Sequence, residues 1–196
     1  MSILDRIFAF LCHRQVDSQL DEPTLVALTA FHEAAHAVLA HVSQFYSLIG
    51  YIQLYSRDIG DTYVSLSRRK LAQAGKPTDI SVLVDPDIVQ DGSLIYLAGY
   101  ASEKHYYRII LDRCTQLPDR SYPENDYAVV RQLIENAGFS SNILSGFEVQ
   151  ASNSVEQRWH TIELLASMIL RSENRTLDAI DAIEFLDRLL GTNSWG

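Results

Sequence analysis

The sequence predicts a mainly helical protein with a small β-hairpin, and two observations support that fold class. Apolar residues recur at helical spacing through several long segments, most clearly over residues 23–44. Two short runs at 50–55 and 62–67 are rich in β-branched and aromatic residues and flank a polar turn at 57–61. We therefore expect the order helix, helix, hairpin and then four helices.

Each expected element has local signals at its ends. The helix over 23–44 follows Asp21 and Glu22, and Pro23 stands where helices often begin. A polar connection is expected at 67–85, and a Ser/Asn-rich loop is expected at 139–153. The remaining helices are expected at residues 3–12, 86–111, 124–137, 155–171 and 176–190, with Gly138 and Gly191 ending two of them.

Length and charge limit the classes of protein to consider. A chain of 196 residues suits one domain, which we place at 21–196, after an apolar helix and linker at 1–20. The net charge of −9 argues against a nucleic-acid partner. The apolar N-terminal run is short and broken by Asp5 and Arg6, so no transmembrane segment is expected there. We expect a cytoplasmic protein, with a peripheral position at a membrane as the alternative.

The most specific motif is His32-Glu33-Ala34-Ala35-His36, within the helix expected over 23–44. Positions i and i+4 lie one turn apart on the same helix face, so the two imidazoles can bind one Zn²⁺. Glu33 can reach a metal-activated water and act as a general base. The alternative is a chance pair of histidines on a partly buried helix. Of the other histidines, His41 is expected to be structural, and His105 is an outside candidate for the site.

Four segments resemble those of one known family. The residues Phe31–Val38 read FHEAAHAV and look like the His-Glu-Ala-Gly-His-Ala-Val segment of FtsH-type zinc metalloproteases. Leu97–Lys104, Glu124–Ala128 and Asn174–Asp178 resemble later segments of that family in the same order. The resemblance covers roughly residues 24–190 and implies an FtsH-type zinc peptidase domain.

The resemblance also supplies the residues missing from the motif. It implies that Asp126 is the third zinc ligand, although an acidic residue near a helix start can also act as an N-terminal cap. Glu103 is the runner-up ligand. It lies on a mostly apolar helix and could accept a hydrogen bond from a ligand imidazole, or it could be an ordinary surface or ion-paired glutamate.

The chain departs from the family in one major respect. It contains no G-x-x-x-x-G-K-[ST] motif, so the AAA ATPase module of the family is not expected here. Proteolysis would then act on peptides, on unfolded segments, or on substrates delivered by a separate ATPase or another protein partner. Ala35 replaces a family glycine, whereas Tyr100 and Lys104 replace an Arg and a Glu, which puts family packing and oligomer contacts in doubt.

These observations predict a zinc metalloendopeptidase that works without an ATPase of its own, with Glu33 as general base. The strand at 62–67 could bind an extended substrate by edge-strand addition, or it could be a plain structural hairpin. The alternative is a catalytically silent, FtsH-like scaffold or adaptor that binds a protein partner. Homo-oligomerisation is open, and the sequence identifies no oxyanion stabiliser.

Overall fold

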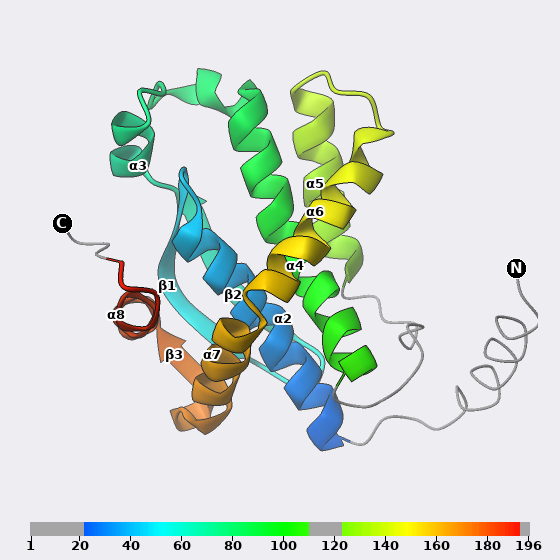
Figure 1. Cartoon of the computed structure of the whole chain (residues 1–196), viewed down its shortest axis with the longest axis vertical. Helices are drawn as coiled ribbons and strands as arrows, with labels where there is room; N and C mark the ends of the chain where they lie inside the picture. The colour runs from blue at the N-terminus through cyan, green and yellow to red at the C-terminus, as the bar shows by residue number, and fades with distance from the viewer. Residues whose placement is uncertain (1–21, 110–122, 193–196) are drawn as a thin grey trace, which may run out of the picture.

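The computed structural model describes residues 22–109 and 123–192, which form a mainly helical fold with a small antiparallel sheet (Figure 1). The predicted fold class is therefore confirmed at this coarse level. The strands are β1 (Tyr46–Leu54), β2 (Gly60–Leu66) and β3 (Thr176–Asp178). The helices are α2 (Glu22–Val42), α3 (Arg68–Gln73), α4 (Pro86–Ile109), α5 (Pro123–Asn136), α6 (Ile143–Gln157), α7 (Trp159–Arg171) and α8 (Ala179–Leu190), with 3₁₀ turns η1 (Ile80–Val84) and η2 (Glu173–Arg175).

Helix α2 lies at the centre of the fold (Figure 1). Every residue from Leu28 to His41 is buried, because α4 and α7 pack along the helix and β1 and β2 cover it. The alanines of this stretch allow the neighbouring elements to approach closely. Among the described helices, α2 is long and apolar enough to cross a membrane, but 83% of its apolar window is buried inside the fold. That burial accounts for its composition.

The sheet has the strand order β2-β1-β3, with both pairs antiparallel. Gly50 lies in a β-bulge of β1 with φ +64°, a conformation that glycine adopts without strain. Because β1 occupies the middle, β2 has one edge without a strand partner among residues 22–109 and 123–192. This edge strand lies beside the central helix, with which it makes direct contacts.

Helix α4 joins the main core to a smaller one. One side of α4 packs along α2, and another packs against α5 and α6. The smaller core between α4, α5 and α6 contains the buried residues Leu97, Val130, Ile134, Phe147 and Ala151. The packing of α5 on this core places its first turn near α2 and α4.

The fold corrects three expectations. The prediction of a loop at 139–153 is wrong, because α6 begins at Ile143 and buries Phe147, Ala151 and Val155. The helix predicted at 176–190 begins only at Ala179, since residues 176–178 pair with β1 as β3. The connection predicted at 67–85 contains α3 and η1. The helix predicted at 3–12 lies outside the described residues, and so does the domain boundary predicted between residues 20 and 21.

Candidate metal centre

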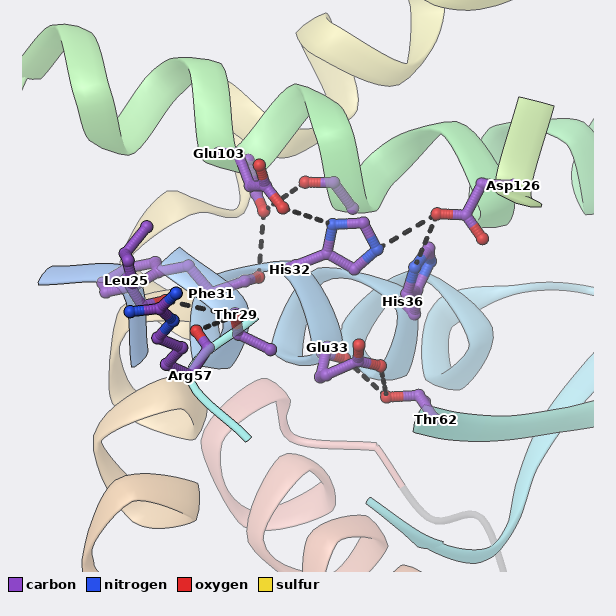
Figure 2. Close-up of polar contacts among 12 residues, drawn as sticks. Leu25, Thr29, Phe31, His32, Glu33, His36, Arg57, Thr62, Glu103 and Asp126 are labelled. Carbon is purple, nitrogen blue, oxygen red and sulfur yellow. Dashed lines mark hydrogen bonds and ion pairs between the residues drawn. The ribbon is translucent and has the colours of Figure 1, made fainter. Parts of the chain in front are cut away.

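Helix α2 and the first turn of α5 bring two imidazoles and one carboxylate together (Figure 2). The rings of His32 and His36 lie 4.6 Å apart between centroids, as expected for residues one helical turn apart. Asp126 Oδ2 lies 3.0 Å from His32 Nε2 and 3.4 Å from His36 Nε2. One ligand atom from each residue lies within 4.8 Å of the other two, so this largely buried group could hold a metal ion.

The far side of each imidazole is held by α4. His32 Nδ1 donates to Glu103 Oε1 at 2.8 Å, and His36 Nδ1 donates to the carbonyl oxygen of Ile95 at 2.7 Å. These bonds turn both Nε2 atoms toward Asp126 and assign the Nδ1 proton of His36, which leaves Nε2 as its potential ligand atom. Glu103 is fully buried and makes the contact expected of it with a candidate ligand imidazole.

Gly99 of α4 keeps the space in front of the imidazoles open. A Cβ atom at this position would lie 2.6 Å from His36 Nε2 and even closer to His32 Nε2. Any larger residue would therefore fill the space that a metal ion needs. The absence of a side chain at Gly99 and the convergence of three donor atoms are independent observations, and both fit a bound cation.

The electrostatics of the group favour a positive charge. Burial lowers the pKa of His32, but the hydrogen bonds that this imidazole donates to Asp126 and Glu103 outweigh this effect and raise the pKa to about 10. Burial also acts to raise the pKa of Asp126, yet His36 and His32 hold that pKa well below its usual range. The Asp126 carboxylate thus stays ionised and stabilises a cation beside it, either a proton on His32 or a metal ion that replaces it.

Glu33 lies outside this donor group and faces β2 (Figure 2). Thr62 Oγ1 donates to Glu33 Oε2 at 2.8 Å and also lies 3.0 Å from the main-chain oxygen of Glu33. A Cβ atom at Gly60 would lie 2.9 Å from both Cγ and Oε1 of Glu33, so the start of β2 approaches the carboxylate closely. The general-base candidate is therefore positioned by the edge strand, next to the group that could hold a metal ion.

The other histidines singled out in the sequence lie elsewhere. His41 interacts with Thr192 and Asp187 of the C-terminal region. His105 packs on Trp159, with ring centroids 4.4 Å apart, and is not a member of the His32–His36–Asp126 group. Of the residues proposed from sequence, the structure thus brings together His32, His36, Asp126 and Glu103, with Glu33 beside them.

Three contributors were missed by the sequence reasoning. An isolated glycine inside a helix often marks a place where another group approaches the helix closely, so Gly99 could have been predicted from the sequence. Thr62 and Gly60 could not have been predicted from the sequence, because only the pairing of β1 with β2 places them against Glu33. The role of Asp126 as an N-terminal acidic residue of α5 and its place in the donor group are compatible, since it occupies the first turn.

Comparison with known proteins adds no family assignment. No protein-family model matches the chain, and no curated protein matches it significantly in sequence. The resemblance to FtsH-type metalloproteases therefore stays a prediction from the motifs. The geometry on its own establishes a buried group of His32, His36 and Asp126 that could hold a metal ion.

Proposed function

We propose that this protein is a zinc metallopeptidase of the FtsH type that hydrolyses peptide bonds. The single observation that carries the proposal is the convergence of His32, His36 and Asp126 in front of Gly99, with Glu33 held beside them. Two imidazoles and a carboxylate form a donor set suited to Zn²⁺ and leave a coordination position open.

Zinc held by these residues would activate a water molecule and polarise the scissile carbonyl group. Glu33 takes a proton from the water as the water oxygen bonds to the carbonyl carbon. Glu33 then gives this proton to the amide nitrogen as the carbon–nitrogen bond breaks, which yields a carboxylic acid and an amine; at neutral pH the acid passes its remaining proton to the amine. Thr62 orients the Glu33 carboxylate for both transfers through the 2.8 Å hydrogen bond.

The proposed substrate is an extended peptide or an unfolded protein segment. Such a chain can add to a sheet edge by main-chain hydrogen bonds. Strand β2 has one edge without a strand partner among the described residues, and the same strand contacts Glu33 through Thr62 and Gly60. A peptide paired with β2 would therefore pass close to the general base. Folded substrates would need a separate ATPase or another partner to deliver them in extended form.

The same donor types also bind Fe²⁺ in oxygenases. Glu33 favours the hydrolytic reading, because peptide hydrolysis needs an acid–base group beside the ligands and an iron oxygenase does not. Elemental analysis of the purified protein separates these readings directly. A catalytically silent scaffold is the remaining alternative, since the fold could bind a partner without using Glu33.

The substitution Glu33→Gln tests the peptidase proposal. We expect zinc to be retained and hydrolysis of unfolded, fluorescein-labelled casein to fall about 10²–10⁴-fold, as for loss of a general base. Glu135→Gln is the matched control, because Glu135 is exposed on α5. Zinc-loaded wild-type protein that cleaves neither casein nor a peptide library would contradict the proposal and favour the scaffold.

A further inference from the structure

Peptide hydrolysis is accelerated by a hydrogen-bond donor to the reacting carbonyl oxygen, and the residues described above do not supply one. When water adds to an amide, the carbonyl oxygen becomes negatively charged, and a preorganised donor aimed at this oxyanion is worth about 10²–10³ in rate. Glu33 acts as a base and cannot donate at that moment. The Nδ1 atoms of His32 and His36 are already committed to Glu103 and Ile95.

Tyr96 of α4 is close to this group. It directly follows Ile95, whose carbonyl oxygen holds His36. The ring centroid of Tyr96 lies 6.4 Å from that of His36, with the ring planes tilted by 60°. The ring of Tyr96 also packs against the small core between α4, α5 and α6, which fixes its position.

The hydroxyl group of Tyr96 differs from that of Tyr127, which packs against the same small core. Tyr127 donates its hydroxyl proton to Glu148 at 2.6 Å. The Tyr96 hydroxyl makes no hydrogen bond within the part of the chain that the structure describes. A tyrosine hydroxyl is protonated at neutral pH and is then a hydrogen-bond donor. It can therefore donate to a bound substrate.

Glu33 and Tyr96 are held from different elements. Glu33 is bonded to Thr62 of β2, whereas Tyr96 belongs to α4 and lies on the side of His36. A peptide carbonyl bound between these elements would meet the general base from one and the phenol from the other. This arrangement matches the needs of a reaction in which a proton leaves the water while charge develops on the carbonyl oxygen.

We propose that Tyr96 is a catalytic residue whose hydroxyl donates a hydrogen bond to the oxyanion formed from the scissile carbonyl. This role rests on the metallopeptidase function proposed above. As the water oxygen bonds to carbon, the carbonyl electron pair moves onto oxygen, where the Tyr96 O–H stabilises it. The proton stays on Tyr96, and the electron pair re-forms the carbonyl when the carbon–nitrogen bond breaks.

Tyr96→Phe tests this role, with Tyr100→Phe as the matched control. Tyr100 lies on the next turn of α4, where its ring faces Tyr127 at 6.0 Å and Lys104 approaches it at 4.7 Å. For each zinc-loaded protein we would measure the zinc content, and kcat and KM on a fluorescence-quenched peptide taken from a casein cleavage site. We would also measure the Kd of a phosphinic peptide that mimics the tetrahedral oxyanion.

We expect kcat of Tyr96→Phe to fall about 10²–10³-fold with KM changed less than about 3-fold. Phosphinic-peptide affinity should fall by a similar factor, while zinc content and the unfolding temperature stay at the wild-type values. Tyr100→Phe should match the wild type throughout.

The outcomes separate the two proposals. A Tyr96→Phe protein with wild-type kcat, or one in which only KM rises, would overturn the role of Tyr96 and leave the peptidase standing. Loss of zinc or of folding in Tyr96→Phe would show a structural role and overturn it equally. A zinc-loaded wild-type protein that cleaves no peptide would refute the peptidase function itself, and the role of Tyr96 with it.

Discussion

Two groups of buried polar side chains lie on α2, one around His32 and His36 and the other around His41. In the first group, Nε2 atoms from two imidazoles and a carboxylate oxygen of Asp126 point at one common space. Carboxylates of Asp126 and Glu103 flank His32 and raise its pKa to about 10 in spite of its burial. This environment favours a cation.

The group around His41 is built differently. His41 Nε2 donates to Thr192 Oγ1 at 3.1 Å, and Thr192 in turn donates to Asp187 at 2.7 Å. Nearby, the Lys70 ammonium donates to four main-chain carbonyl groups at the end of α2 and just beyond it, those of Ala40, His41, Ser43 and Tyr46. Burial lowers the pKa of His41, so this imidazole is held neutral.

The difference shows what separates a candidate metal-binding histidine from a structural one. Both groups contain buried histidine on the same apolar helix, so burial and composition do not distinguish them. The polar atoms around His41 pair with one another, and the lysine caps the helix end. Those around His32 converge on a space that Gly99 leaves open.

Filling the space in front of the two imidazoles is expected to have the largest effect on zinc binding. Gly99→Ala would place a methyl group against both Nε2 atoms, so we expect bound zinc to fall below about a tenth of an equivalent. Gly146→Ala is the control, because a Cβ at Gly146 meets nothing within 4 Å. The control should keep its zinc and gain about 0.5–1 kcal/mol in free energy of unfolding. Full zinc content in Gly99→Ala, by elemental analysis, would contradict the proposed geometry.

A smaller effect on zinc binding is expected from weakening the hydrogen bond that holds the His32 imidazole. Glu103→Gln keeps the size of the side chain but removes the negative charge that holds His32 Nδ1. Zinc affinity should fall about 10–100-fold, as for other partners of ligand imidazoles. Competition with a chromophoric chelator measures this, with Glu156→Gln as the control, since Glu156 forms an exposed pair with Arg108. Equal losses in the two variants would show that Glu103 does not act through His32.

The smallest effect concerns pH and the His41 group. The pKa of His41 is lower in the folded state than the value of about 6.5 in the unfolded state. As the pH falls through about 6.5, the unfolded state therefore binds more protons than the folded state. This contribution to stability is complete above pH 6.5 and is lost as the pH falls below it. Replacing His41 with Gln should therefore make the free energy of unfolding fall less between pH 7 and pH 5, by about 1 kcal/mol.

The control for this measurement is His160→Gln, because the His160 side chain is 78% exposed. Urea unfolding at each pH gives the comparison. If His41→Gln shows the same pH dependence as His160→Gln, the imidazole of His41 is not held neutral, and the contrast between the two groups fails.

Part of this account was readable from the sequence. The spacing of His32 and His36 placed both imidazoles on one face because helix geometry is local. Glu103 and Asp126 lie far along the chain and entered only through resemblance to a family. The structure places both against His32, at 2.8 Å and 3.0 Å. Their roles in metal binding and catalysis stay predictions.

Other parts were not readable, for physical reasons. Helix α6 contains three Ser residues, one Asn and one Gly, so propensity favoured a loop, but burial of its Phe147, Ala151 and Val155 face outweighed propensity. The i, i+4, i+8 spacing of those three residues was the overlooked signal. Strand β3 is too short for any periodicity, and the contact of Thr62 with Glu33 depends on long-range packing.

The most direct test of the central claim is the zinc content of the purified protein, wild type against Asp126→Ala. Asp181→Ala, at an exposed position of α8, is the control. We predict about one zinc per chain in the wild type and the control, and a large loss in Asp126→Ala, because two imidazoles alone hold zinc weakly. Wild-type protein that binds no zinc even after metal is added, or an Asp126→Ala protein that binds it fully, would contradict the His32–His36–Asp126 centre.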